Sequence, residues 1–304
     1  MADLALIKKL RETTGCGIAD CNKALQACGD NLEESVDWLR KKGLSSAAKK
    51  SSRIAAEGIV AIKIEGNKGS IIEVNAETDF VGRNDQFQNL VTQLLDNSGK
   101  FGSDVEAFKN SDFKGTSVDE EIKNQIGIIG ENINLRRIDT VSVNKGAVIG
   151  YVHNVVKGNL GRIAVLVGLE SNVEKSKLQD LGKQIAMHIA AAKPEALNIE
   201  SVNQEKLQRE TDILREQAKN SGKPESIIEK MMEGRVRKYY EEVILLEQNF
   251  VMDDKIKIKD LVSNFAKEIG DDVKLTDYKL YILGEGIDKK ETDFAAEVAS
   301  MTKS

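Results

Sequence analysis

Residues 58–85 read GIVAIKIEGNKGSIIEVNAETDFVGRND, and two apolar runs in this stretch are separated by a polar, glycine-containing segment. An apolar, β-branched run leads into the turn GNKG at residues 66–69, and a second apolar run ends near Ala76. Two such runs on either side of a glycine-containing turn predict a pair of antiparallel strands. Apolar residues then recur at Phe87, Leu90, Val91, Leu94 and Leu95. Their helical spacing predicts an amphipathic helix directly after the hairpin.

A second stretch, GAVIGYVHNVVKGNLGRIAVLVGLE at residues 146–170, repeats the succession of strand, turn and strand. A helix with an apolar stripe follows it, at Leu178, Leu181, Ile185 and Ile189. Between the two units, residues 120–143 predict a helix to about Gly130 and then a strand. Two βββα-like halves imply a duplicated α+β core with antiparallel sheets.

Residues 1–44 predict three short helices around one small core, the third ending at Gly43. This unit is similar to a ubiquitin-associated-type module, which binds other proteins. Gly15-Cys16-Gly17 does not predict a phosphate-binding loop, because a helix and not a strand precedes it. Residues 45–56 are small and basic, which predicts a linker or a loosely packed helix.

Residues 203–248 are highly charged and are interrupted by SGKPE at 221–225. Gly222 can end one helix and Pro224 can begin the next, so the segment predicts an antiparallel helical hairpin, or coiled coil. The predicted division is therefore a partner-binding module (1–44), a linker (45–56), a core N-subdomain (57–143), a core C-subdomain in two parts (144–202 and 249–287), the inserted hairpin (203–248) and a C-terminal helical module (288–304).

The chain has 304 residues, 31% of them charged, and a net charge of −5. It contains no long run of Lys and Arg, so direct binding to nucleic acid is not expected. It contains no apolar run of the roughly 18–20 residues that span a bilayer, so no membrane association is expected. The N-terminal residues MADLALIKKLRETTG carry an early Asp and no long apolar core. No signal peptide is therefore expected, and the predicted location is the cytoplasm.

Candidate catalytic groups are few. The cysteines Cys16, Cys21 and Cys28 have no histidine nearby, which is typical of reduced thiols in a small core. The only histidines are His153, near a predicted strand end, and His188, among apolar helix residues. No phosphate loop, metal triad or nucleophile elbow is present. These observations favour a binding protein over an enzyme, and no cofactor or metal is expected.

The tetrapeptide Glu-Thr-Asp-Phe occurs at residues 77–80 and again at 291–294. The first copy follows a strand, so Phe80 lies either exposed on a strand-to-helix connection or packed as a hydrophobic staple beside a Thr78 or Asp79 cap. The second copy precedes AAEVASM and predicts a short amphipathic terminal helix capped by Thr292 or Asp293. The two copies are therefore expected to have different roles.

Seven stretches together resemble bacterial elongation factor Ts, and they occur in that family's order over nearly the whole chain. They are TGCGIADCNKAL, ETDFVGRNDQF, IGENINLRR, GRIAVLV, IAMHIAAAKPEAL, SGKPESIIEKMMEGR and ETDFAAEVASM. The resemblance implies a guanine-nucleotide exchange factor that binds GDP-bound elongation factor Tu and catalyses GDP release, so that GTP can rebind. No bond is made or broken in such a step, which agrees with the lack of catalytic motifs.

The resemblance also implies particular contacts. Thr78, Asp79, Phe80 and Val81 would form a wedge, with Phe80 in an apolar slot of the partner, Asp79 near its Mg²⁺ and Val81 in support. Other expected contacts are Arg11, Ile18, Ala19, Ile129, Gly130, His153, Asp293 and Phe294. The segment GIAD at 17–20 stands where relatives commonly carry two methionines, so the contact at Ala19 is expected to be weaker. For the hairpin two roles remain as alternatives, homodimerisation and contact with the partner.

Three other functions remain as alternatives. A general scaffold would bind several partners without affecting nucleotide release. A ribosome- or RNA-associated factor, suggested by the basic segment KKGLSSAAKKSSR, would bind RNA with a strong salt dependence. A thiol enzyme would lose its activity when its cysteines are alkylated.

Overall fold

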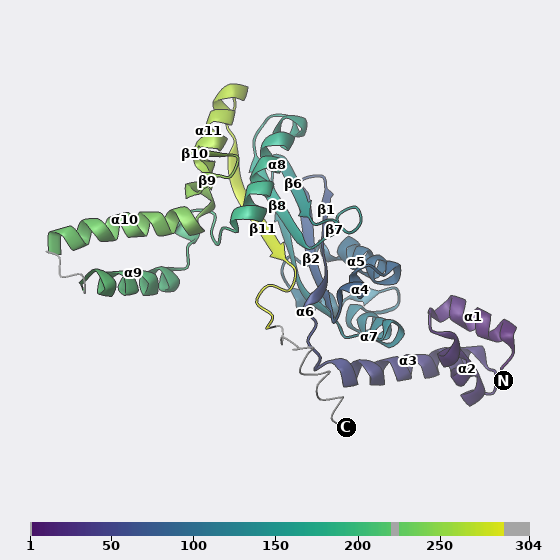
Figure 1. Ribbon diagram of the computed structural model, residues 1–304. Helices are drawn as coiled ribbons and strands as arrows, with labels where there is room; N and C mark the ends of the chain where they lie inside the picture. The colour runs from purple at the N-terminus through teal and green to yellow at the C-terminus, as the bar shows by residue number, and fades with distance from the viewer. Residues whose placement is uncertain (1, 220–224, 289–304) are drawn as a thin grey trace.

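The computed structural model describes residues 2–219 and 225–288 (Figure 1). It combines many helices with antiparallel sheets, which confirms the predicted α+β class. Among the described residues, no helix has both the length and the apolar composition needed to cross a membrane.

Three helices form the N-terminal unit: α1 (Leu4–Thr14), α2 (Ile18–Ala27) and α3 (Leu32–Lys50). Asp3 and Asn31 cap the first and third helices with their side-chain oxygens, and Gly15 ends α1 in the left-handed conformation. Their small core holds the buried Ile7, Leu10, Cys21, Ala24, Leu25 and Leu39. The three predicted helices are thus confirmed.

The prediction that the third helix ends at Gly43 was wrong, since α3 continues to Lys50. Gly43 lies where α3 crosses α7 (Val118–Ile129). A Cβ atom on Gly127 of α7 would lie only 2.7 Å from the Cα atom of Gly43. Gly43 therefore permits a close helix crossing, and residues 45–50, for which a linker and a loosely packed helix were both expected, continue α3 as a helix.

Gly127→Ala is expected to destabilise the protein by about 1–3 kcal/mol, because the new methyl group meets the α3 backbone and outweighs the gain in helix propensity. Gly234, in α10 (Glu225–Val243), is the matched control, because a Cβ there would meet no atom within 4 Å. Gly234→Ala should stabilise by about 0.5–1 kcal/mol. Urea denaturation of both variants checks this, and equal shifts would contradict the account of the crossing.

The core contains two antiparallel sheets. The first has the order β5-β2-β1-β7, from β1 (Glu57–Glu65), β2 (Lys68–Ala76), β5 (Ile133–Ser142) and β7 (Leu160–Gly161). The second has the order β11-β8-β6, from β6 (Gly146–His153), β8 (Ile163–Glu170) and β11 (Lys274–Ile282). A small separate pair is formed by β3 (Asp112–Phe113) and β4 (Thr116–Ser117).

Among the long strands of the two main sheets, each half has the order strand, strand, helix, strand, and its last strand pairs with its second. The expectation of three such strands before a helix is therefore corrected, because the third long strand follows the helix. The first half carries α5 (Asp85–Ser98), α6 (Val105–Lys109) and α7 on its sheet, and the second carries α8 (Lys175–Ala192) and α11 (Ile258–Ile269).

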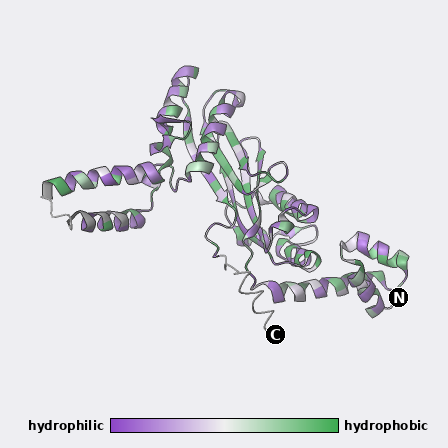
Figure 2. Ribbon diagram, in the orientation of Figure 1, coloured by the Kyte–Doolittle hydropathy of each residue, from purple (hydrophilic) through white to green (hydrophobic). Residues whose placement is uncertain are grey.

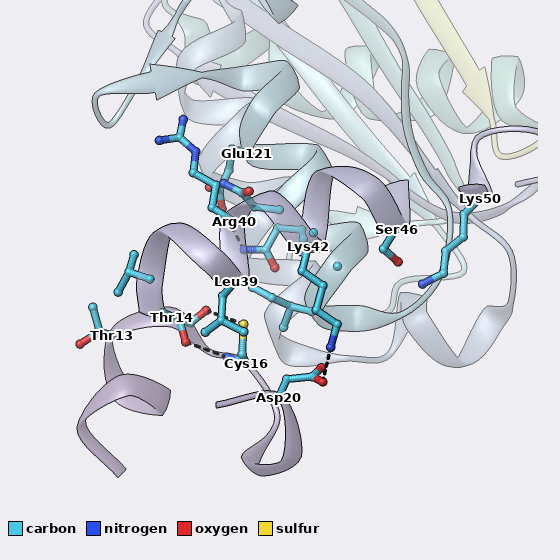
Figure 3. Close-up of a pocket in the computed structure, with 16 residues that line it drawn as sticks. Thr13, Thr14, Cys16, Asp20, Leu39, Arg40, Lys42, Ser46, Lys50 and Glu121 are labelled. Carbon is cyan, nitrogen blue, oxygen red and sulfur yellow. Dashed lines mark hydrogen bonds and ion pairs between the residues drawn. The ribbon is translucent and has the colours of Figure 1, made fainter. Parts of the chain in front are cut away.

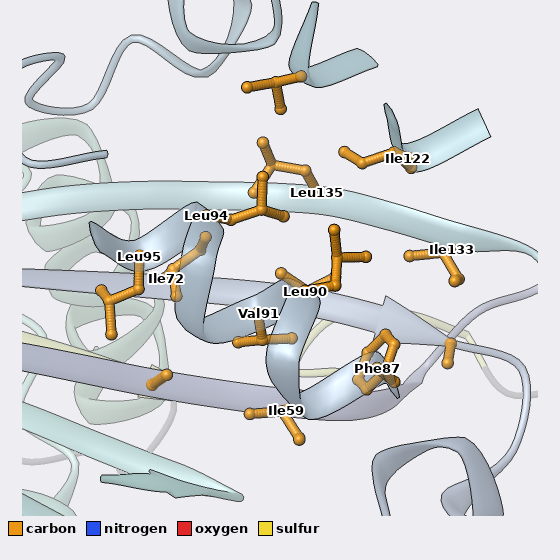
Figure 4. Packing of buried hydrophobic residues seen from close by; sticks show 14 of the residues in the cluster. Ile59, Ile72, Phe87, Leu90, Val91, Leu94, Leu95, Ile122, Ile133 and Leu135 are labelled. Atoms are coloured by element: carbon orange, nitrogen blue, oxygen red, sulfur yellow. The ribbon is translucent and has the colours of Figure 1, made fainter. Parts of the chain in front are cut away.

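The two sheets pack face to face between these helices, which gives four layers (Figure 1). Along β1, Ile59 and Ala61 face the helix α5, while Val60 and Ile62 face the second sheet. Figure 4 shows the cluster on the helix side of the first sheet, in which Ile59 packs together with Phe87, Leu90 and Val91 of α5. Burial of both faces explains why the strands read as nearly continuous apolar runs, which Figure 2 shows as hydrophobic colour along the sheets.

The charged segment forms α9 (Gln204–Lys219) and α10, which lie side by side away from the sheets (Figure 1). Leu207, near the start of α9, packs in one cluster with Tyr240 and Val243, near the end of α10, so the two helices run antiparallel. The predicted turn at Gly222 and Pro224 lies outside the described residues. At the base of the hairpin lie η1 (Ile199–Ser201), η2 (Leu245–Glu247), β9 (Asn249–Phe250) and β10 (Asp253–Lys257).

His188 of α8 is fully buried near this base. Its Nδ1 atom accepts the Val251 N–H at 3.3 Å, so its Nε2–H donates to Gln248 Oε1 at 2.9 Å. Burial lowers the pKa of this imidazole, although the bond to Gln248 acts in the opposite direction. The neutral ring therefore joins α8 to the segment that follows the hairpin.

The free energy of unfolding is expected to fall when the pH drops from 7.5 to 5.5, because the pKa of His188 is lowered in the folded state. A histidine with a lowered pKa in the folded state stabilises the fold above its unfolded pKa of about 6.5, and protonation of the unfolded chain removes that contribution as the pH falls. Urea denaturation of the protein and of His188→Gln at both pH values measures this change in the free energy of unfolding. An equal pH dependence in the two proteins would contradict the assignment.

Candidate functional site

The first Glu-Thr-Asp-Phe copy forms a turn between β2 and α5. A single helical turn, α4 (Asp79–Gly82), follows the end of β2 at Ala76. The side chain of Phe80 is 77% exposed, whereas Val81 is only 7% exposed and packs in the core. Phe80 therefore projects from a turn that is anchored by the residue beside it.

The alternative in which this copy only caps a helix is not what the structure contains. Thr78 makes no side-chain capping bond to α4, and Asn84 instead caps α5 by accepting the N–H groups of Gln86 and Phe87. The exposure of Phe80 also excludes its role as a buried staple.

Two contacts hold the ends of the Phe80 turn. The carboxylate of Glu131 accepts the backbone N–H of Thr78 at 2.9 Å and its hydroxyl at 2.7 Å. At the other end, Gln88 Nε2 donates to the carbonyl of Gly82 at 3.1 Å. A residue larger than glycine at position 82 would crowd the Gly58 carbonyl, at 3.0 Å from its Cβ.

Ile129 and Gly130 lie beside this turn. Gly130 ends α7 in the left-handed conformation, with φ of 92°, and is exposed, while Ile129 is half-buried against the core of the first half. Because Glu131 follows Gly130 directly and binds Thr78, the structure brings these predicted positions together. Sequence reasoning missed Glu131 and Gln88, although Glu131 lies within the stretch IGENINLRR.

Asp79 is exposed and lies 3.5 Å from Arg83, one turn along. Such an exposed ion pair contributes little to stability and leaves the carboxylate free to exchange partners. Within residues 2–219 and 225–288, no group of three or more His, Cys, Asp or Glu side chains is arranged to hold a metal ion.

The remaining predicted contacts are separate from the Phe80 turn in the fold. Arg11, Ile18 and Ala19 are exposed on the three-helix unit, at the end of α1 and the start of α2. His153 is exposed at the end of β6, where its Nδ1 atom lies 2.9 Å from the Tyr151 hydroxyl. Asp293 and Phe294, with the second Glu-Thr-Asp-Phe copy, lie outside the described residues.

A cavity of about 530 Å³ lies between the three-helix unit and α7 (Figure 3). Cys16 lines it, together with Asp20 and Lys42, which form an ion pair. Cys21 is fully buried in the core of the three-helix unit, and burial raises the pKa of its thiol. A protonated, buried thiol is a poor nucleophile, which weakens the thiol-enzyme alternative.

A comparison with known families matches residues 77–285 to the family Elongation factor TS. Curated proteins named Elongation factor Ts are similar over nearly their whole length. That of Rhodospirillum centenum is 54% identical over 98% of this chain and 97% of its own, and those of Rhodospirillum rubrum (49%) and Rickettsia felis (48%) are similar over comparable shares, 98% of this chain and 98% and 97% of their own. The chain belongs to the elongation factor Ts family, as its sequence motifs predicted.

Proposed function

We propose that this protein is a guanine-nucleotide exchange factor of translation elongation, which binds GDP-bound elongation factor Tu and accelerates the release of GDP. One observation carries the proposal: Phe80 is 77% exposed on a turn in which Val81 is buried and Thr78 and Gly82 are held by hydrogen bonds. An aromatic ring held outside the core in this way loses little freedom when it enters a slot on a partner.

In this proposal Phe80 enters an apolar slot of the partner's nucleotide-binding domain, and Asp79 approaches the Mg²⁺ shell. A carboxylate brought near a bound metal competes for its water and protein contacts, which loosens the metal and the phosphates together. Ile129 and Gly130 would contact the same domain, since Glu131 joins their turn to the Phe80 turn. No covalent chemistry is needed, so the proposed role is not that of an enzyme that makes or breaks bonds.

The other proposed contacts fix where the wedge enters. Arg11, Ile18 and Ala19 are exposed on the three-helix unit, and His153 is exposed on the second half of the core. Contacts spread over several units would use binding energy from remote surfaces to drive the wedge into place. The C-terminal residues Asp293 and Phe294 are proposed to add a further contact.

Exchange by this mechanism requires the factor to bind nucleotide-free partner more tightly than GDP-bound partner. The coupling is reciprocal, so GDP must weaken binding of the factor as much as the factor weakens binding of GDP. Calorimetric titration against both forms of elongation factor Tu tests this. We expect a clear preference for the nucleotide-free form. Equal affinities would contradict the proposal, because a factor that binds both forms equally cannot shift the equilibrium between them.

A further inference from the structure

We infer that Glu131 is a positioning residue, which fixes the direction in which Phe80 projects without itself acting as the wedge. The inference rests on the proposed function and adds to it the part of the fold that prepares the wedge before any partner arrives. It is based on hydrogen bonds that run in both directions between two turns of the first half. One is the Phe80 turn with Glu77 before it, and the other is the turn at residues 130–132.

The carboxylate of Glu131 makes two contacts with a single residue. One of its oxygens accepts the Thr78 N–H at 2.9 Å, and the other accepts the Thr78 hydroxyl at 2.7 Å. Hydrogen bonds to an ionised acceptor are stronger than those between neutral groups, and two at once also fix an orientation. Thr78 is thereby held in both backbone and side chain, two residues before Phe80.

Glu77 completes the pair from the opposite turn. Its carboxylate accepts the Asn132 N–H at 2.6 Å, so each turn supplies a carboxylate to a backbone N–H of the other. Asn132 is buried, and its Nδ2 donates to the carbonyl of Arg53 at 2.8 Å, while Arg53 Nη1 lies 3.5 Å from Glu77. Three segments distant in sequence, at 53, 77–78 and 131–132, thus meet at the foot of the wedge.

These contacts are suited to directing Phe80 more than to stabilising the fold. Helix α4 has only four residues, and a single helical turn does not hold its own direction in water. Thr78 is only half-buried, so water can replace a lost carboxylate at its N–H. Loss of Glu131 should therefore free the Phe80 turn while leaving the core intact, and the freedom regained must be lost again on binding.

The test is a double-mutant cycle on the acceleration of GDP release from elongation factor Tu. Glu131→Ala removes both contacts to Thr78 and is expected to reduce the acceleration roughly tenfold. Glu131→Gln keeps one accepting oxygen, so its acceleration of GDP release should lie between that of the unaltered protein and that of Glu131→Ala. Glu106→Ala is the matched control, since it removes the same charge from an exposed position on α6 and should change nothing.

In the Phe80→Ala background, Glu131→Ala is expected to cause no further loss, because a residue that acts through Phe80 has nothing left to position. An equal fold loss in both backgrounds would overturn the inference, since Glu131 would then act on its own. A wild-type release rate in Glu131→Ala alone would also overturn it.

A second readout does not depend on the partner. Amide hydrogen exchange at Thr78, measured by NMR in the free protein, is expected to accelerate in Glu131→Ala, while the amide of Ile72 in β2 stays protected. Unchanged exchange at Thr78 would overturn the inference. If Phe80→Ala alone left GDP release unaffected, the wedge proposal would fail, and faster exchange at Thr78 would still establish that Glu131 fixes the turn.

Discussion

Replacing Phe80 by alanine is expected to reduce the acceleration of GDP release by about 30-fold, the effect of losing a binding hot spot of about 2 kcal/mol. The same change should shift the free energy of unfolding by no more than about 0.5 kcal/mol, because the ring is already in solvent. Release of a fluorescent GDP and urea denaturation of the same preparation measure the two effects together.

Two control variants separate a wedge from a structural phenylalanine. Phe87, seven residues further on, is 0% exposed, so Phe87→Ala should destabilise the protein by about 3–5 kcal/mol. Met252→Ala removes a side chain that is 55% exposed in the second half and should affect neither readout. A large loss of stability in Phe80→Ala, or an equal loss of exchange in Met252→Ala, would contradict the assignment of Phe80.

Glu73→Ala is expected to destabilise the fold by about 3–5 kcal/mol, as much as the loss of a buried aromatic side chain. The carboxylate of Glu73 in β2 is 0% exposed and binds Arg136 Nη1 at 3.0 Å and Arg137 Nε at 2.5 Å. It also accepts the N–H of Gly284 at 2.9 Å, which fastens the segment after β11 to the first sheet. Its removal takes the buried carboxylate away from two half-buried guanidinium groups, which then keep only weaker contacts such as those to the carbonyls of Glu285 and Ile282.

The pH dependence of stability reports on the same site. Burial by itself would raise the pKa of Glu73, but the Gly284 N–H, the Arg137 guanidinium and the Asn75 amide outweigh it and hold the pKa below its usual range. A carboxyl with a lowered pKa stabilises the fold above its unfolded pKa of about 4.3 and loses that contribution as the pH falls further. Thermal unfolding at pH 7 and pH 4 should therefore show a smaller drop in Glu73→Gln than in the unaltered protein.

The control for Glu73 is Glu65, near the turn of the same hairpin, whose side chain is exposed and pairs with Lys63. Glu65→Ala should cost less than about 1 kcal/mol, as surface ion pairs do. If Glu73→Ala cost no more than Glu65→Ala, the buried carboxylate would not be what joins β2 to the segment after β11.

The local elements could be predicted from the sequence because each depends on near neighbours. Spacing along residues 58–98 predicted β1, β2 and α5, and the glycine at 130 predicted the end of α7. The stacking of the two sheets could not be predicted, because apolar runs show that both faces are covered without showing what covers them. Gly43 misled for a similar reason: its role depends on Gly127, which is distant in the sequence.

The site was predicted in the same uneven way. The residues of the Phe80 turn stand together in the sequence, but whether Phe80 is exposed depends on the burial of Val81 and on the partner of Thr78. Glu131 lies 53 positions from Thr78, and no periodic pattern connects them. Its acidic side chain directly after a helix-ending glycine is the signal that was available, and only the fold gives it a meaning.

The measurement that tests the central claim most directly is stopped-flow release of a fluorescent GDP from elongation factor Tu, with and without the intact protein. The account predicts that the release rate rises with the concentration of the protein and reaches a plateau far above the spontaneous rate. A release rate that does not change at any concentration would contradict the account, and the scaffold alternative would then take its place.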